Sequence, residues 1–308
     1  MPKVAIIGSG LIGRAWATVF ASHGWTTALY DPAPGAAKAA RSHIARNLKE
    51  LAALGLVKDA AASSANLVVA GNLEEALAGV AFVQENGPET VAAKKEIHAA
   101  IDRLAPASAI VASSTSVLVS SLWAKDLKHR ARVLVGHPVN PPHLVPIVEL
   151  CPAPWTDPKV VEKARRIYEK VGQVPITVRK EIDGFVLNRL QAVLLAEAYQ
   201  LVGDGVVSPE DLDKTIRDGL GLRWAFMGPF ETIELNAPAG IADYNSRYAE
   251  NLGRLTGRDA FSKRNAKAIM AEWAGEQSPE RIARLSRWRD GRLAALKAHK
   301  RAAKKKPD

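Results

Sequence analysis

Residues 4–13 read Val-Ala-Ile-Ile-Gly-Ser-Gly-Leu-Ile-Gly, an apolar run that leads directly into three glycines with the spacing Gly-x-Gly-x-x-Gly. Gly8 allows a tight turn at the end of a strand, Gly10 lets the backbone come close to a pyrophosphate, and Gly13 lets the following helix pack close to the sheet. The helix that begins near Leu11 directs the positive end of its dipole towards the phosphates. This stretch predicts a strand, a turn and a helix that together bind a dinucleotide.

An acidic residue closes the next apolar run and extends the pattern. Thr27-Ala28-Leu29-Tyr30 is followed by Asp31, close to the spacing at which an acid at the end of the second strand binds ribose hydroxyls. A carboxylate at that place accepts hydrogen bonds from the ribose of NAD and repels the 2′-phosphate of NADP. Glycine-rich turns are common by themselves, but the complete order of strand, glycines, helix, strand and acid is specific. The sequence therefore predicts NAD as the cofactor.

The wider chain is long enough, at 308 residues, for two domains with their own cores. Over residues 1–183, short apolar strands alternate with helical stretches, which predicts an α/β domain with a Rossmann-type, doubly wound, mostly parallel sheet. The expected strands are Lys3–Ile7, Thr26–Tyr30, Leu67–Ala70, Ala81–Gln84, Ala109–Ala112, Arg132–Val135, Pro146–Leu150 and Val174–Val178. After residue 184 no convincing strand follows. We expect an all-helical second domain at 184–300, which opens with a long amphipathic helix at 185–202 and includes a helix capped by Ser208.

The formal net charge of +10 is concentrated at the C-terminal end of the chain. Residues 297–308 contain six lysines and arginines against Asp308, which is half of the excess. Such a run is typical of a basic disordered tail, here 301–308. Because no helix-turn-helix, zinc or aromatic-basic pattern accompanies it, we expect no specific nucleic-acid binding. The remaining positive charge suits an enzyme whose cofactor and substrate are anions.

Other classes of site and location are disfavoured by what the sequence lacks. Cys151 is the single cysteine, so no disulfide forms within the chain, and its apolar neighbours indicate a small buried side chain rather than a nucleophile. The seven histidines have no metal-ligand spacing, so we expect no metal site. No apolar run approaches the ~20 residues of a membrane span. The first residues already form a strand, so we expect no signal peptide, no membrane association and a cytoplasmic location.

Two titratable residues stand in or directly after consecutive apolar runs. His137, in Gly-His-Pro-Val-Asn-Pro-Pro, follows an apolar strand, and Glu149 lies within the apolar run Ile-Val-Glu-Leu. The carboxyl ends of the strands form the ligand crevice of a doubly wound sheet, so a histidine there is placed to act as a general base. Glu149 would fix its tautomer and stabilise the imidazolium. Each also has a structural interpretation, as a loop histidine with its bonds satisfied or as an acid paired with an arginine.

Further polar residues are candidates for the same crevice. Ser113-Ser114-Thr115-Ser116 follows a strand, where one hydroxyl would bond a substrate oxygen and the others would cap or turn the chain. Asn188 lies in the first part of the long helix, where it would either contact substrate or make a structural bond. Glu89 and Lys94 would reach the nicotinamide end of the cofactor, or form a surface pair. Asn140 is a candidate substrate contact, and Arg223 is a candidate clamp for a substrate carboxylate or a structural ion-pair partner.

These residues resemble the L-3-hydroxyacyl-CoA dehydrogenase superfamily over nearly the whole chain. The motifs that carry the resemblance are Gly-Ser-Gly-Leu-Ile-Gly from residue 8, Ser-Ser-Thr-Ser from 113, Gly-His-Pro-Val-Asn-Pro from 136, Val-Glu-Leu from 148 and Gly-Phe-Val-Leu-Asn-Arg-Leu from 184. Three further stretches resemble the lambda-crystallin branch, which comprises L-gulonate 3-dehydrogenases. They are Pro-Val-Asn-Pro-Pro from 138, Gly-Leu-Arg-Trp-Ala-Phe-Met-Gly-Pro-Phe-Glu-Thr from 221 and Trp-Arg-Asp from 288.

The resemblance implies an NAD-dependent oxidation of a 3-hydroxy acid. It implies His137 as the catalytic base, Glu149 as its partner, and Ser116 and Asn188 as contacts to the reacting oxygen. It implies contacts to NAD from Leu11, Ile12, Asp31, Glu89 and Lys94. It also implies that the helical domain forms a homodimer and that the substrate is a small hydroxy acid, with L-gulonate preferred.

Alternative substrates and functions remain open at this point. Acyl-CoA members of the family have an aromatic pair after the motif histidine, whereas this chain has Pro138-Val139, which disfavours a CoA thioester. Carnitine 3-dehydrogenases share Gly-Leu-Arg-Trp-Ala-Phe-Met-Gly but tend to have Ala-Asp-Arg in place of Leu187-Asn188-Arg189, so L-carnitine ranks second. A redox-inert protein that retains only the scaffold is a further alternative. The joint presence of a histidine, a glutamate, a serine and an asparagine in catalytic motifs argues against it.

Overall fold

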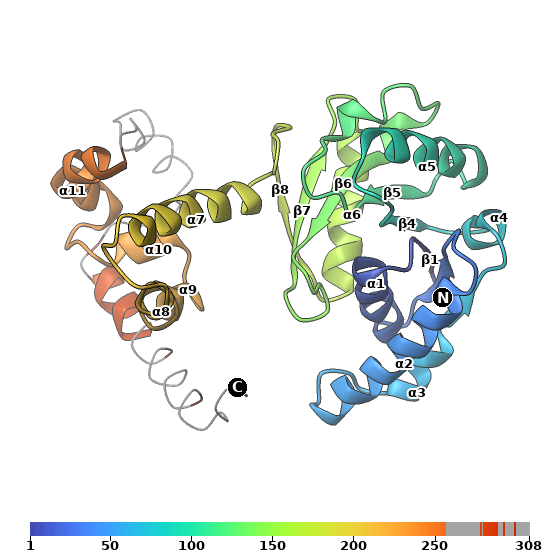
Figure 1. The fold of residues 1–308 in the computed structure, drawn as a ribbon, viewed down its shortest axis with the longest axis horizontal. Coiled ribbons are helices and arrows are strands. Elements are labelled where there is room, and N and C mark those ends of the chain that lie inside the picture. Colours follow the sequence, from blue (N-terminus) through green and yellow to red (C-terminus); the bar gives the residue numbers. More distant parts are fainter. Residues whose placement is uncertain (257–277, 279, 289–291, 293–298, 300–308) are drawn as a thin grey trace. The chain divides into compact units, whose positions relative to one another are not determined.

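The computed structural model describes residues 1–256, 278, 280–288, 292 and 299 (Figure 1). Contacts divide the chain into two units, Met1–Leu194 and Leu195–Asp308. The predicted domain boundary after residue 183 lies N-terminal to this division and stays a prediction. The predicted basic tail at 301–308 lies outside the described residues.

The first unit contains one mixed sheet of eight strands, which confirms the predicted doubly wound, mostly parallel α/β fold. The strands are β1 Lys3–Ile7, β2 Thr26–Tyr30, β3 Leu67–Val69, β4 Phe82–Glu85, β5 Ile110–Ser113, β6 Val133–Pro138, β7 Ile147–Pro152 and β8 Val174–Thr177. Their order is β3-β2-β1-β4-β5-β6-β7-β8, and every neighbouring pair is parallel except β6 and β7. Chain order reverses between β1 and β4, and this switch point is where open α/β sheets bind ligands.

His137 lies within a strand and not after it. The prediction that the strand ends at Val135 is wrong, because β6 continues to Pro138. His137 lies within the antiparallel pair, directly opposite Glu149 on β7. The strand extends because β7 turns back onto β6 and supplies backbone partners for these residues.

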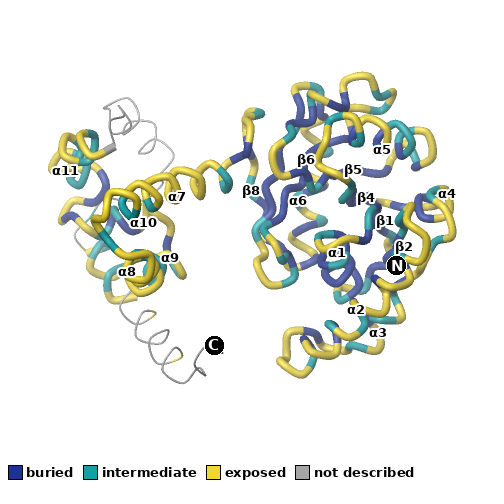
Figure 2. The backbone as a smooth tube through the Cα atoms, viewed as in Figure 1, coloured by how far each residue is buried: buried dark blue, intermediate teal, exposed yellow. Residues whose placement is uncertain are grey.

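Helices cover both faces of the sheet, since successive residues of each strand point to opposite sides. The helices of this unit are α1 Leu11–Ser22, α2 Ala36–Ala53, α3 Ala60–Ala65, α4 Leu73–Leu77, α5 Val91–Leu104 and α6 Pro158–Lys170, with 3-10 turns η1 Ser120–Leu122 and η2 Arg130–Arg132. One core packs side chains of α1, α2 and α6 against Val4 and Ile6. The other packs α4 and α5 against Ala5 and Ile7. Figure 2 shows the strands as the buried centre of this unit.

Helix α7 (Leu187–Gly203) begins two residues later than the predicted 185–202. Gly184 and Phe185 have φ of 72° and 51°, in the left-handed region that a right-handed helix cannot include. Phe185 is fully buried in the core of the first unit. The packing of this aromatic side chain stabilises a conformation that the helical periodicity did not reveal.

The second unit is helical throughout its described residues. After α7 it contains α8 Pro209–Lys214, the π-helical turn η3 Thr215–Leu220, α9 Gly221–Trp224, α10 Pro229–Glu234 and α11 Gly240–Thr256. The Ser208 hydroxyl accepts a hydrogen bond from the Asp211 N–H at 3.1 Å, which confirms the predicted cap of α8. In the part of the chain that the structure describes, no helix has the length and apolar character needed to span a bilayer.

Candidate active site and cofactor cavity

The glycine turn after β1 has the geometry that its sequence predicts. Gly8 has a φ of 88°, and a Cβ there would lie 2.7 Å from the Asn86 carbonyl oxygen. A Cβ on Gly13 would lie 1.9 Å from the Gly8 carbonyl oxygen, so only glycine lets α1 pack this close to β1. At Gly10 the space is open, with no atom within 4 Å of the position of a Cβ. Helix α1 begins at Leu11 without a side-chain cap and without an acidic residue in its first turn.

These features fit a bound pyrophosphate. The first turn of a helix carries N–H groups without intrahelical partners, and the backbone of Leu11 and Ile12 belongs to that turn. A side-chain cap would occupy those N–H groups, and a carboxylate in the first turn would repel an anion. Helix α1 has neither. The open space beside Gly10 leaves room for phosphate oxygens to approach the backbone.

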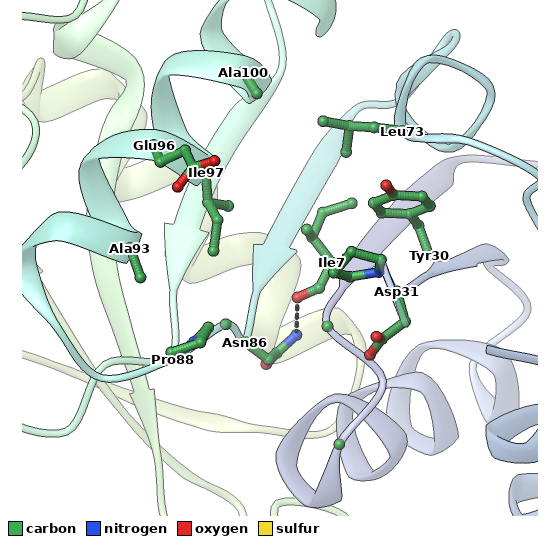
Figure 3. A pocket seen from close by; sticks show the side chains of 14 residues that line it. Ile7, Tyr30, Asp31, Leu73, Asn86, Pro88, Ala93, Glu96, Ile97 and Ala100 are labelled. Carbon is green, nitrogen blue, oxygen red and sulfur yellow. Dashed lines mark hydrogen bonds between the residues drawn. The ribbon is translucent and has the colours of Figure 1, made fainter. Parts of the chain in front are cut away.

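A cavity of about 680 Å³ lies beside this turn, between the ends of β1, β2 and β4 (Figure 3). Asp31 and Asn86 line it, together with Gly8, Gly10 and Tyr30. The Asn86 amide donates to the Ile7 carbonyl at 3.3 Å, the bond drawn in Figure 3. The cavity opens at the switch point of the sheet, where a nucleoside would extend from the glycine turn.

Asp31 binds the glycine turn as well as lining the cavity. Its Oδ2 accepts hydrogen bonds from the Ser9 N–H at 2.7 Å and the Ser9 hydroxyl at 2.9 Å, and its Oδ1 accepts from the Ala33 N–H at 3.0 Å. Partial burial by itself raises the pKa of Asp31, but these hydrogen bonds outweigh it and lower the pKa. The group is therefore a carboxylate, and Oδ1 keeps acceptor capacity for a ribose hydroxyl.

His137 and Glu149 form a buried, hydrogen-bonded pair. His137 Nδ1 lies 2.8 Å from Glu149 Oε2, and their exposed fractions are 5% and 1%. Burial raises the pKa of Glu149, but the bonds to His137 and to the backbone of Leu187 and Val186 lower it overall. Glu149 is thus an acceptor, which places a proton on Nδ1 and leaves Nε2 of the neutral ring unprotonated. Among the described residues Nε2 makes no hydrogen bond, and the ring packs against Phe185 with centroids 5.4 Å apart.

Glu149 also binds the start of α7, a role that its sequence motif did not predict. Its Oε1 accepts from the N–H groups of Val186 at 2.9 Å and Leu187 at 3.0 Å. These donors lie at the beginning of the helix, where no intrahelical acceptor is available. The pattern Gly-Phe-Val-Leu was a possible signal, since the left-handed residues before a helix leave its first N–H groups free for a distant acceptor.

Ser116 and Asn188 are brought together by the structure. The Asn188 amide nitrogen donates to the Ser116 carbonyl oxygen at 2.8 Å, and Ser116 is exposed. Glu89 shapes the same loop, because its Oε1 accepts from the Ser116 N–H at 2.8 Å and the Val117 N–H at 3.2 Å. Glu89 therefore binds the loop that carries Ser116, and its predicted contact to NAD stays a prediction.

Lys94 lies in a buried ion pair and not in a surface pair, and its predicted contact to NAD stays a prediction. Its side chain is buried, and Nζ donates to both carboxylate oxygens of Glu85 at 2.9 Å and to the Gly87 carbonyl at 3.1 Å. The nearest oxygen of Glu89, its expected partner, is 4.0 Å away. All three ammonium protons have acceptors within the protein, so the structure gives Lys94 a supporting position behind the Gly87 loop.

The remaining candidates are placed as follows. Asn140 is exposed after β6, and Arg223 lies on α9 in the second unit. Their contacts to substrate stay predictions.

Cys151 is fully buried, and burial raises its pKa to about 12, as expected for a small buried side chain. The described residues hold no group of three or more histidine, cysteine or acidic side chains suited to a metal.

Two family models match the chain one after the other. The NAD binding domain of 3-hydroxyacyl-CoA dehydrogenase matches residues 3–182, and the C-terminal domain of 3-hydroxyacyl-CoA dehydrogenase matches residues 184–283. Together they include the glycine turn, the His137–Glu149 pair and most of the helical region. The cofactor of this chain is therefore NAD.

Individual proteins are similar over almost the full length. Lambda-crystallin of Oryctolagus cuniculus is 40% identical over 306 residues, which is 96% of this chain and 96% of the relative. L-carnitine dehydrogenase of Pseudomonas putida is 38% identical over 296 residues, which is 95% of this chain and 92% of the relative. Among solved structures, the 3-hydroxyacyl-CoA dehydrogenase of Archaeoglobus fulgidus matches with a TM-score of 0.76 at 26% identity, covering 96% of this chain and 98% of that one.

Proposed function

Since the chain belongs to the 3-hydroxyacyl-CoA dehydrogenase family of NAD-dependent oxidoreductases, we propose that it oxidises the 3-hydroxyl of L-gulonate to the ketone of 3-dehydro-L-gulonate. The observation that carries the reaction type is the 2.8 Å bond between His137 Nδ1 and Glu149 Oε2. The support for L-gulonate is the set of motifs shared with the lambda-crystallin branch, together with 40% identity to a lambda-crystallin.

In this proposal His137 is the general base. Its Nε2 accepts the proton of the 3-hydroxyl while Nδ1 stays bonded to Glu149, whose negative charge stabilises the imidazolium that forms. The chemistry that NAD would supply when bound is a nicotinamide ring able to take the hydride from C3. The Ser116 hydroxyl and the second N–H of the Asn188 amide, the one not needed for the Ser116 carbonyl, hold the substrate oxygen. Arg223 would bind the carboxylate of the acid with two parallel hydrogen bonds.

The leading alternative is oxidation of L-carnitine, which 38% identity to an L-carnitine dehydrogenase favours. L-gulonate is an anion with several hydroxyls, whereas L-carnitine also carries a quaternary ammonium that aromatic side chains recognise. Rates with L-gulonate, L-carnitine, 3-hydroxybutyrate and 3-hydroxybutyryl-CoA, each with NAD, separate these substrates. A higher kcat/KM with L-carnitine or with the thioester contradicts the proposed substrate.

The test of the reaction type is the variant His137→Ala. General-base catalysis is worth ~10²–10⁴-fold, so turnover should fall by at least that range while NADH binding stays unchanged. Asn140→Ala, in the loop that follows β6, is the comparison variant, because a substrate contact that is not the base should raise KM more than it lowers kcat. Turnover of the His137 variant within tenfold of the parent chain would remove His137 from the role of base.

We also propose that the chain forms a homodimer through its helical region. Helix α7 exposes a series of large apolar side chains, namely Leu190, Val193, Leu194, Leu195 and Tyr199. Exposed apolar surface of this kind marks an interaction site more often than a solvated helix face.

A further inference from the structure

The carboxylate of Glu85, at the end of β4, is the most densely hydrogen-bonded side chain of the first unit and has no part in the proposed reaction. It is fully buried. Oε1 accepts from the Gly87 N–H at 2.5 Å, and Oε2 accepts from the Ser113 hydroxyl at 2.6 Å. Lys94 donates to both oxygens, and His98 Nε2 lies 3.1 Å from Oε2. The two oxygens of this one side chain therefore bind the loop after β4, the end of β5 and helix α5 at once.

Two loops leave the sheet at this carboxylate. One, residues 86–90, follows β4 and lines the cofactor cavity with Asn86 and Gly87. Glu85 binds its backbone twice, directly through the Gly87 N–H and indirectly through Lys94, which donates to the Gly87 carbonyl. The other loop, residues 114–117, follows β5 and carries Ser116.

The same two loops are joined to each other above the carboxylate. The Ser114 hydroxyl donates to the Asn86 side-chain oxygen at 2.7 Å, and it accepts from Trp16 Nε1 at 3.0 Å on α1. Ser113, held by Glu85, also accepts from the Thr115 N–H at 3.3 Å. A displacement of the Glu85 carboxylate would therefore move the cavity wall and the Ser116 loop together.

We infer that Glu85 is a positioning residue, which fixes both the 86–88 wall of the NAD cavity and the loop that presents Ser116. The inference rests on the proposed role of Ser116 for its catalytic part, and on the cofactor cavity alone for its binding part. Lys94 then acts on the cofactor through Glu85 and the Gly87 carbonyl rather than by direct contact.

The test removes Glu85 and Lys94 together, since a buried Lys94 ammonium left without its carboxylate would destabilise the chain whatever the role of Glu85. In Glu85→Gln with Lys94→Met, the NADH dissociation constant, measured by nicotinamide fluorescence, should rise about tenfold or more, because the cavity wall loses two charge-assisted hydrogen bonds. The KM for NAD should rise with it.

A matched control is available in the same unit. Asp102 on α5 and Arg132, directly before β6, form an ion pair at 3.1 Å, and neither residue lines the cavity. Asp102→Asn with Arg132→Met should lower the melting temperature without changing the NADH dissociation constant more than about twofold. An unchanged dissociation constant in the Glu85 variant, or an equal rise in both variants, overturns the inference.

Ser113→Ala is a second test that keeps the ion pair intact. It removes the hydroxyl that bonds both the Glu85 carboxylate and the Thr115 N–H of the Ser116 loop, so kcat should fall several-fold while the NADH dissociation constant stays within about twofold. Unchanged kcat would refute the effect on Ser116. If the parent chain oxidises none of the hydroxy acids, the proposed reaction fails, yet the NADH titrations still decide whether Glu85 positions the cavity wall.

Discussion

At the residue scale, Glu149 has two functions because its two oxygens face different partners. Oε2 orients His137, while Oε1 accepts two backbone N–H groups at the start of α7. The carboxylate is needed as an anion on the His137 side only, since an amide oxygen also accepts backbone N–H donors. The catalytic and structural functions of this residue are therefore separable by substitution.

Glu149→Gln is expected to lower kcat by ~10²–10⁴-fold and to change the melting temperature little. The Gln oxygen still accepts from Val186 and Leu187. Its NH₂ group then faces His137 Nδ1 as a donor, which moves the ring proton to Nε2 and removes the base. Steady-state kinetics and thermal unfolding measure the two effects.

Glu149→Ala is the paired variant, because it leaves both backbone N–H groups without a partner. It should lose comparable activity and in addition about 1–3 kcal/mol of unfolding free energy for each unsatisfied group. Equal unfolding free energies for the Gln and Ala variants would contradict the assigned function of Oε1.

Glu85 also predicts how stability depends on pH. Burial raises its pKa, but the hydrogen bond and charge of His98, the charge of Lys94 and the Ser113 hydroxyl lower it from 4.5 to about 2. Because the pKa is lower in the folded chain, Glu85 stabilises the fold fully above the unfolded value. This contribution, on the order of 3 kcal/mol, is lost as the pH falls towards 2.

Urea unfolding from about pH 5 down to about pH 2.5 measures this effect. The unfolding free energy of the parent chain should fall more steeply than that of Glu85→Gln with Lys94→Met. Asp31, Asp102 and Glu149 also have lowered pKa values, but they are present in both proteins and cancel in the comparison. Parallel curves would show that Glu85 does not titrate as described.

At the element scale, the glycines between β1 and α1 have two different requirements, one for packing and one for binding. A Cβ on Gly13 would meet backbone at 1.9 Å, whereas a Cβ on Gly10 would meet nothing within 4 Å. Gly10 also has a φ of −67°, which any residue adopts. The two glycines therefore have different reasons to be glycine.

We expect Gly13→Ala to lower the melting temperature and to weaken NADH binding, because α1 must move away from β1. Gly10→Ala should leave the melting temperature unchanged and weaken NADH binding alone, because its methyl group occupies space that the pyrophosphate needs. Thermal unfolding and NADH titration of both variants measure this difference. A destabilised Gly10→Ala variant, or one that binds NADH as the parent does, would contradict it.

The elements themselves follow largely from the sequence, because period-two apolar runs and helix caps are local signals. All eight strands, the helix after the glycines and the cap at Ser208 were predicted. The errors lie where tertiary contacts decide the ends of an element, namely the extension of β6 through His137 and the start of α7 after Phe185.

The candidate site was predictable in part for the same reason. The glycine turn, Asp31 and the His137–Glu149 pair have sequence motifs, and the structure brings each together. Glu85 was missed because its partners are 9, 13 and 28 residues away and no local spacing connects them. Lys94 and His98 are one helical turn apart on α5, which was the only sequence signal of a shared partner.

At the scale of the whole molecule, the proposed homodimer depends on the apolar side of α7. Leu195 and Tyr199 are one turn apart on this helix, with exposed fractions of 47% and 78%. Leu195→Asp with Tyr199→Asp places two charges on that side, and a charge buried without a partner costs more than an interface side chain contributes. Light scattering after gel filtration should give twice the mass of one chain for the parent and the mass of one chain for the variant. Leu54→Asp, at an apolar residue of the first unit that is 73% exposed, should remain dimeric. A variant of α7 that keeps the doubled mass would place the interface on another surface.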